Sequence, residues 1–505
     1  MPYNIDGKKM ARNTVALYLR TIITMIISFF TTRVTLEVLG SEDYGLNNLV
    51  GGVVSLFSFL NGSMATAVQR YFNIAIGQGK EDELGRIYGV GCYLHIIVAL
   101  ITTVIAEIFA IFFLSKMNIP QERMFAAHVV FQISIISMAL NIMNVPNYAL
   151  LKAHEKFDVL AKLDIIRAFL RLGILYLLCV IDVDKLILLS SLGFCVTLYY
   201  VFTLFFKARY YSEAHHPICR DRELIKQMLS FISFLIITVL AEMLRKQGLI
   251  MLINIFFGLA VNAAYAIAAQ ISFMVSTFVI NIKQPIIPQM MAAYGAGDKN
   301  SMFRLISFGT KVTFLMMLIL SLPIIFEIDW ILEFWLKEPP GNTSILAILV
   351  LVNINIASFT YFLYQGVHAT GNIKIQQIWM SSLYVLNVAL IYLAFVLRAE
   401  FTFALYITIC ISMAQCLLNL ICARKYYGYS MRSFVFQLTI PCILVTIIIS
   451  AILWSITIYF PSSFWRAIFV FVVGLLLCSG LGYRLLLNKD ERIQAVSMVK
   501  RIIKR

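Results

Sequence analysis

Ionisable residues that interrupt long apolar stretches are the first candidates for chemistry in this sequence. Arg167 and Arg171 are four residues apart in the apolar run 158–181, so they share one face if the run is helical. Counted from the inner end of this run, the two residues would lie roughly 14–20 Å along the helix, in the middle of the membrane. Because a lipid-facing arginine at that depth is costly, we expect both to line a polar cavity. In the alternative, Asp164 neutralises Arg167 locally and Arg171 has no local partner.

A second charged group lies in the run 229–256, where Glu242 precedes Arg245 and Lys246 by three and four residues. Two interpretations remain open. The group forms an ion pair within the helix, or Glu242 is an ion-coupling carboxylate beside a cationic binding surface.

The intramembrane charges are mainly positive, which favours an anionic ligand. Away from the ends of the apolar runs, seven Lys and Arg residues stand against two clear acids, Glu107 and Glu242, or three with Asp164. Arg33 lies near the end of its run, where it can instead snorkel to the interface. The predicted substrate-binding residues are Arg20, Arg33, Arg167, Arg171, Arg245 and Lys246, with Glu242 as the predicted ion-coupling residue.

Motifs for catalysis and for metal binding are missing from the sequence. The six histidines are dispersed, and neither a G-x-x-x-x-G-K-[ST] loop nor a G-x-S-x-G motif occurs. The nine cysteines form no C-x-x-C pair, which favours buried thiols over disulfides or zinc. We therefore predict no catalytic residue, no metal and no cofactor.

The elements that position these charges are transmembrane helices. The chain is 61% hydrophobic and 13% charged, whereas a soluble domain is about a quarter charged. We predict an all-α polytopic membrane protein with about fourteen helices, because a span needs about 20 apolar residues. The runs are 13–38, 45–67, 86–114, 124–148, 158–181, 185–206, 229–256, 261–282, 305–327, 343–366, 375–397, 401–422, 434–460 and 464–484.

The distribution of positive charge indicates the topology. Of the 41 Lys and Arg residues, 28 fall on the side that holds both termini and six on the other side. Positive residues collect in cytoplasmic loops, so both termini are predicted to be cytoplasmic. This distribution also explains the net charge of +15 without a nucleic-acid partner.

A faint internal repeat supports the helix count. Gly77-Gln-Gly79, Arg86-Ile87 and Gly91 recur 218 residues later as Gly295-Ala-Gly297, Arg304-Leu305 and Gly309. Six helices separate the two copies, which predicts two parallel six-helix lobes plus two C-terminal helices. The expected division is 1–225, 226–424, and 425–505 with a basic cytoplasmic tail.

Further motifs carry a resemblance to a known superfamily. They are Arg33 before Leu39-Gly40, Tyr44-Gly45-Leu46, Gly258 before Tyr265-Ala266-Ile267-Ala268, Pro285 with Pro288, Trp335-Leu336, and Gly366 before Ala369, Gly371, Ile373 and Lys374. In this order they resemble the multidrug/oligosaccharidyl-lipid/polysaccharide exporter superfamily, most of all its polysaccharide branch with the Wzx-type O-antigen flippases.

The resemblance implies a multi-pass protein of the bacterial inner membrane with a central cleft between two lobes. It also implies a flippase for an undecaprenyl-pyrophosphate-linked oligosaccharide, such as an O-antigen or capsular repeat unit. Membrane lipids and a polysaccharide polymerase or glycosyltransferases are its implied partners. Two alternatives stay open. One is an ion-coupled antiporter for drugs or small molecules, and the other is a membrane polysaccharide polymerase, which the short loops disfavour.

Overall fold

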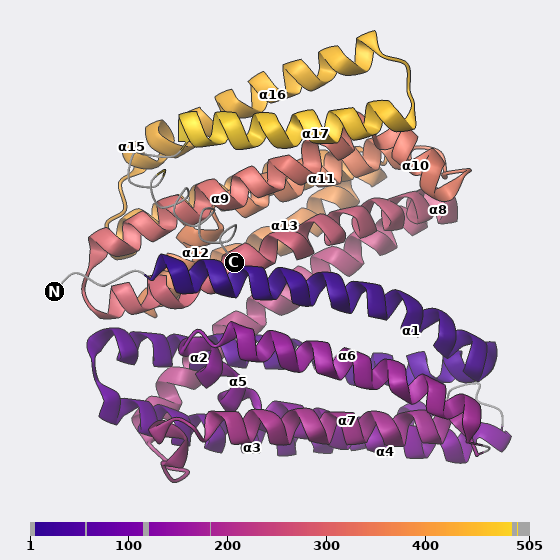
Figure 1. The fold of residues 1–505 in the computed structure, drawn as a ribbon, viewed down its shortest axis with the longest axis vertical. Helices are drawn as coiled ribbons and strands as arrows, with labels where there is room; N and C mark the ends of the chain where they lie inside the picture. The colour runs from indigo at the N-terminus through magenta and orange to yellow at the C-terminus, as the bar shows by residue number, and fades with distance from the viewer. Residues whose placement is uncertain (1–5, 56–57, 115–120, 182, 487–491, 493–505) are drawn as a thin grey trace. The chain divides into compact units, whose positions relative to one another are not determined.

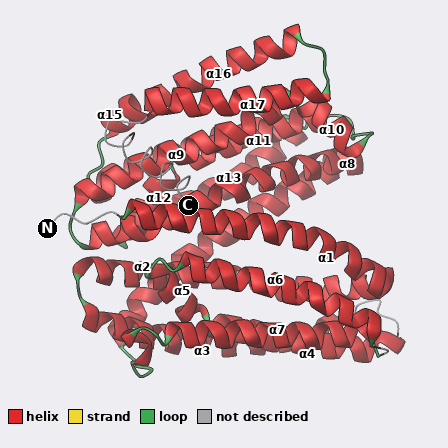
Figure 2. Ribbon diagram, viewed as in Figure 1, coloured by secondary structure: helices red, strands yellow, loops and turns green. Residues whose placement is uncertain are grey.

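Helices form all the regular structure in the described part of the chain. The computed structural model describes residues 6–55, 58–114, 121–181, 183–486 and 492 (Figure 1). No strand occurs among these residues (Figure 2). The helices of the first half are α1 Gly7–Ser55, α2 Ser58–Gln78, α3 Glu81–Leu114, α4 Gln121–Met143, α5 Val145–Ala153, α6 Phe157–Val180, α7 Lys185–Ala208 and the short η1 Ser212–His215.

The second half begins with the longest element of the chain, the 74-residue α8 Arg222–Gly295. It is followed by α9 Lys299–Phe326, α10 Ile328–Leu336, α11 Thr343–Phe359, α12 Tyr361–Thr370, α13 Lys374–Val396 and α14 Phe403–Tyr427. The last elements are α15 Met431–Phe434, the π-helical η2 Val435–Thr439, α16 Ile440–Tyr459, α17 Phe464–Leu481 and the π-helical η3 Gly482–Leu486.

The predicted apolar runs coincide with helices wherever the structure describes them. Ten helices among the described residues are long and apolar enough to span a membrane. α8 counts once among these ten, although it contains two of the predicted runs. The charged α6 is not among the ten. The prediction of an all-α polytopic membrane fold is confirmed.

Two glycines break long helices at equivalent places in the repeat. Gly40 in α1 has φ 73° and ψ 172°, and Gly258 in α8 has φ 77° and ψ −172°. Only glycine adopts this region of backbone space without a large steric cost. The two breaks are 218 residues apart, the same offset as in the sequence repeat, so each separates two helices within one continuous element.

The repeated Gly-x-Gly motif forms the same helix cap twice. Gly79 ends α2 with φ 69°, and Gly297 follows α8 with φ 76°. The capping bonds match residue for residue at the offset of 218: Gly79 N to Ile76 O (3.1 Å) and Lys80 N to Ala75 O (3.1 Å), against Gly297 N to Tyr294 O (3.0 Å) and Asp298 N to Ala293 O (3.0 Å). This is the Schellman pattern, in which a left-handed residue satisfies the last free carbonyls. The repeat therefore encodes helix ends as well as helix order.

Internal contacts divide the chain into two compact units. The N-terminal unit comprises residues 11–236, and the C-terminal unit comprises residues 1–10 and 237–505. α8 contributes residues to both units. The start of the chain belongs to the C-terminal unit, where Gln289 Nε2 donates to Asp6 O at 3.2 Å. The finer division at residues 225 and 424, and the placement of the termini, stay predictions.

In the N-terminal unit, α4 packs against both α3 and α7, and α2 packs against α5. Buried apolar side chains fill the contact around α4, including Ala126, Ala127, Val130, Phe131 and Ile135. This packing leaves other faces of α4, α5 and α7 to line the pocket described below.

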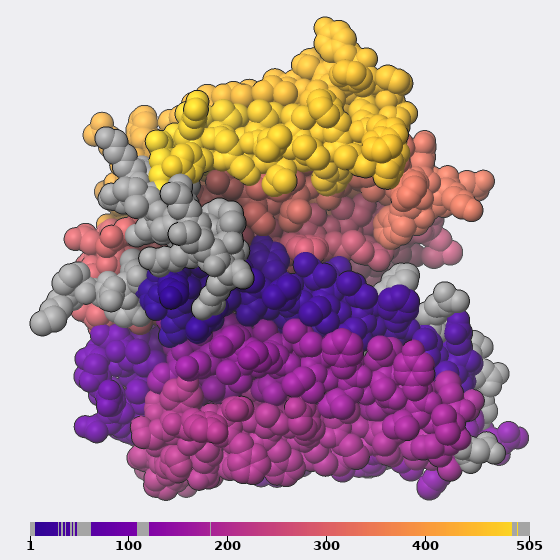
Figure 3. Space-filling model, in the orientation of Figure 1, coloured from indigo at the N-terminus to yellow at the C-terminus, as the bar shows by residue number. Residues whose placement is uncertain are grey.

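In the C-terminal unit, α16 and α17 pack on α9 and on each other. Buried aliphatic residues such as Val445, Ile449, Leu453 and Val470 make this contact. The outward faces of α16 and α17 are also apolar, with exposed Ile447, and Figure 3 shows them as a continuous yellow surface. An apolar outer surface is the expected complement of lipid.

A buried ion pair fastens α17 to the end of α9. Glu327 lies between α9 and α10, and its side chain is fully buried. Arg466 in α17 donates to Glu327 through Nε (2.9 Å) and Nη2 (2.8 Å), and through Nη1 to Phe460 O (2.8 Å). This bidentate geometry is the strong form of an arginine–carboxylate contact. We call the contact the Glu327–Arg466 clasp.

Breaking this clasp is predicted to destabilise the protein. Glu327→Ala or Arg466→Ala should each cost about 3–5 kcal/mol of unfolding free energy, because each leaves an uncompensated buried charge. The double variant should cost less than the sum of the two. The measurement is thermal unfolding of the purified protein in detergent. As a control, Lys80→Ala disrupts the exposed Lys80–Glu83 pair and should cost less than about 1 kcal/mol. Additive losses in the double variant would show that the clasp does not act as a pair.

Candidate substrate-binding pocket

A pocket of about 980 Å³ lies inside the N-terminal unit. Residues of α1, α2, α4, α5, α6 and α7 line it, from Thr31 in α1 to Leu204 in α7. Pockets for drug-sized ligands have volumes of about 300–1,000 Å³. The space is therefore large enough for a small organic molecule.

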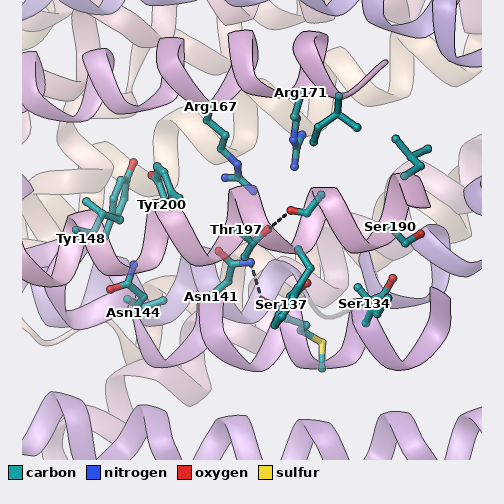
Figure 4. A pocket seen from close by; sticks show the side chains of 18 of the residues that line it. Ser134, Ser137, Asn141, Asn144, Tyr148, Arg167, Arg171, Ser190, Thr197 and Tyr200 are labelled. Carbon is teal, nitrogen blue, oxygen red and sulfur yellow. Dashed lines mark hydrogen bonds between the residues drawn. The ribbon is translucent and has the colours of Figure 1, made fainter. Parts of the chain in front are cut away.

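One wall of the pocket is polar because two helices each present a polar stripe. Ser134, Ser137 and Asn141 lie at positions i, i+3 and i+7 of α4, and Ser190 and Thr197 lie seven residues apart in α7. These spacings place each set on one helix face. Figure 4 shows the two stripes on the same side of the pocket.

The opposite wall carries the two arginines that the sequence singled out. Figure 4 shows Arg167 and Arg171 extending from α6 toward the polar stripes. The guanidinium carbon of Arg167 lies 4.8 Å from the ring centroid of Tyr200, a cation–π contact. Arg171 has an exposed side chain that reaches the pocket.

A smaller cavity of about 300 Å³ shares both arginines with the pocket. Its lining includes Asp164, Arg167 and Arg171 from α6, and Thr24 and Ser28 from α1. Asp164 Oδ2 lies 3.2 Å from Nη1 of Arg20 in α1. Asp164 therefore forms an ion pair with a residue 144 positions away, not the local pair with Arg167 considered from the sequence.

The remaining predicted site residues lie elsewhere or outside the described residues. Glu242 Oε1 lies 2.7 Å from Lys246 Nζ, which is the ion pair within the helix left open above. The guanidinium carbon of Arg245 lies 5.3 Å from the ring centroid of Tyr384. All three belong to the C-terminal unit, whereas Arg20, Arg167 and Arg171 belong to the N-terminal unit. The side chain of Arg33 is not among those that the structure describes.

Sequence reasoning missed the pocket residues that α4, α5 and α7 supply. The polar stripes of α4 and α7 were absent from the predicted site, as were Tyr148 and Lys152 of α5. The signal was present as polar residues at helical spacing inside apolar runs. This signal is weaker than that of a charge, because hydroxyl and amide groups cost less to bury than charged groups do.

Comparisons with known proteins identify the fold. Residues 16–177 match the family model MatE. The crystal structure of a MATE point mutant aligns with a TM-score of 0.71 at 13% identity, over 84% of this chain and 98% of that one. The MATE transporter ClbM, in complex with Rb⁺, aligns with a TM-score of 0.68 at 16% identity, over 85% and 96%.

The chain has the fold of MATE transporters. A multidrug-resistance MATE family transporter of the MOP superfamily, in an outward-facing conformation, aligns with a TM-score of 0.63 at 12% identity, over 84% of this chain and 97% of that one. No curated protein sequence matches the chain. This fold agrees with the expected superfamily, and the expected polysaccharide branch is not confirmed.

The prediction of a lipid-linked oligosaccharide flippase is wrong. The family model and these solved structures are of MATE transporters, and they support the antiporter alternative. The error has a physical origin, because the sign of intramembrane charge reports the charge of a ligand but neither its size nor a lipid anchor. The short Gly and Pro motifs did not distinguish between branches of one superfamily.

Filling the pocket from Gly193 is predicted to block it without unfolding the protein. A Cβ added at Gly193 meets no atom within 4 Å, so Gly193→Phe places its ring in the pocket. Transport of a dye that the wild type carries should fall at least about tenfold, equivalent to about 1.4 kcal/mol. The measurement is initial transport rate in proteoliposomes, with thermal unfolding alongside.

The matched control is Gly173→Phe in α6. This glycine also has open space around a Cβ, but it lines neither cavity described above. Normal transport is expected for it. Equal losses in both variants would show that the effect comes from the helices and not from the pocket.

Proposed function

We propose that this protein is an antiporter that exports small organic anions across a membrane in exchange for an ion. The pocket of the N-terminal unit binds the substrate, with Arg167 and Arg171 facing its negative group. The MATE fold and the match of residues 16–177 to MatE support the transport class. The charge of the pocket supports the substrate class.

One observation carries the choice of an anion. The charged residues that line the pocket are Lys152, Arg167 and Arg171, and no acid of the described residues lines it. In a low-dielectric site, a field of one sign concentrates ligands of the opposite sign and disfavours those of like sign. A cationic drug would meet repulsion here, whereas a carboxylate, sulfonate or phosphate would receive hydrogen bonds from two guanidinium groups.

The polarity of such pockets varies among related structures. A MOP superfamily transporter from Pyrococcus furiosus aligns with a TM-score of 0.63 at 11% identity, over 84% of this chain and 98% of that one. The binding pocket of that protein is described as having reverse polarity, which suggests a different function for it. A change of pocket charge on this fold therefore has a precedent.

Exchange of an anion for a cation is energetically favourable for export. Moving one elementary charge through 100 mV is worth about 2.3 kcal/mol, and an anion leaving a negative interior moves in the favourable direction. An inward proton or sodium ion gains the same energy. The ion-coupling role of Glu242 stays a prediction, and its pair with Lys246 is the contact that such an ion would have to disturb.

Substrate charge is predicted to decide transport. Proteoliposomes should carry carboxyfluorescein, an anion, and not ethidium, a cation. Arg171→Ala should raise the KM for carboxyfluorescein about 10–100-fold, because a hydrogen bond to a charged group is worth about 1.5–3 kcal/mol. The KM of Arg171→Lys should lie between those of the wild type and Arg171→Ala, since lysine keeps the positive charge but cannot form the bidentate contact.

Arg222→Ala, at the exposed start of α8, is the control and should leave KM unchanged. Dissipating the proton and sodium gradients together should stop concentrative transport. Transport of ethidium alone by the wild type would refute the anion assignment. Concentrative transport that survives the loss of both gradients would refute ion-coupled antiport.

A further inference from the structure

Asp164 is the one acid among the described residues that line the two cavities. The charged residues of these linings are Lys152, Asp164, Arg167 and Arg171, with a net charge of +2. An acid is unexpected beside a pocket for anions, because it repels the ligand. Its presence therefore calls for a role.

The position of Asp164 relates it directly to the binding arginines. Asp164, Arg167 and Arg171 lie at positions i, i+3 and i+7 of α6, so they form one stripe about 10 Å long. Asp164 lines only the small cavity, whereas both arginines line the small cavity and the pocket. The same two cations thus face Asp164 on one side and the substrate space on the other.

The ion pair between Asp164 and Arg20 is only partly buried and is not bidentate. The contact joins its Oδ2 to Arg20 Nη1 at 3.2 Å, with 26% of the Asp164 side chain and 20% of the Arg20 side chain exposed. The Glu327–Arg466 clasp, in contrast, has two short bonds and a fully buried carboxylate. Asp164 therefore lacks the geometry of a purely structural lock.

We propose that Asp164 is an internal counter-ion that competes with the anionic substrate for the positive field of Arg20, Arg167 and Arg171. In the empty protein its carboxylate offsets part of the cost of three guanidinium groups in a low-dielectric site. When a substrate anion occupies the pocket, that anion takes over this role. Asp164 thereby keeps the affinity for the anion low enough for rapid release. This inference rests on the proposed function.

Changing the charge at Asp164 and at Arg20 is predicted to have opposite effects. Asp164→Asn should tighten carboxyfluorescein binding about tenfold, the effect of one charge at roughly 10 Å and an effective dielectric of about 20. Its kcat should fall because release becomes slow. Arg20→Gln should weaken binding of the anion. Without Arg20, the negative charge of Asp164 offsets only the positive charges of Arg167 and Arg171. Arg20→Gln/Asp164→Asn restores the net charge and should return the affinity close to that of the wild type.

The test is equilibrium binding of carboxyfluorescein to the purified protein, with KM and kcat from proteoliposomes and thermal unfolding for each variant. Glu107→Gln in α3 is the control, since this half-buried acid accepts a hydrogen bond from Gln132 and lines neither cavity. If Arg20 and Asp164 form only a structural pair, both single variants will weaken binding and lower stability together. That result overturns the inference.

The proposed function and the counter-ion role of Asp164 can be refuted by different results. Absence of carboxyfluorescein binding by the wild type refutes the proposed function and, with it, the inference. Wild-type binding and transport with an unchanged or weakened Asp164→Asn variant refutes the role of Asp164 alone. A tightened Asp164→Asn variant with an unchanged kcat refutes the link between counter-ion and release.

Discussion

Charge inside an apolar layer is stable only where an opposite charge, an aromatic ring or water compensates it, and the N-terminal unit is arranged around this constraint. Arg167 is compensated by the ring of Tyr200, and Arg20 by Asp164. The side chain of Arg171 lines the pocket. The contacts join α6 to α7 and α1 to α6, so these three helices must keep their relative positions for the charges to be tolerated at all.

The two halves of the repeat share their backbone design but not their chemistry. Gly40 and Gly258 break helices at equivalent positions, and the caps at Gly79 and Gly297 match bond for bond. The charges do not repeat. At the offset of 218, the chain has Thr238, Ser382, Val385 and Ala389 where the first copy has Arg20, Asp164, Arg167 and Arg171. The substrate site proposed here is therefore a property of one copy of a duplicated scaffold.

Much of the fold could be predicted from the sequence because hydrophobic length and helix breaks are local signals. The apolar runs coincide with helices, and the Gly-x-Gly repeat marks helix caps. The site could be predicted only in part. Arg167 and Arg171 share a pocket as their spacing indicated, but the partner of Asp164 is 144 residues away, and no local pattern identifies it. The stripes of α4 and α7 form a site only after the helices pack. The substrate was misassigned because charge sign is informative about polarity and not about molecular size.

The Glu327–Arg466 clasp also has a consequence for biogenesis. Its two residues are 139 positions apart in the chain. At a synthesis rate of about 5–20 residues per second, Glu327 leaves the ribosome roughly 7–28 s before Arg466 does. During that interval the carboxylate must remain hydrated or be shielded by other molecules, since burial without its partner is costly. Final packing of α9 and α10 is thereby delayed until α17 has been made, and a chain cut short before Arg466 leaves Glu327 without this partner.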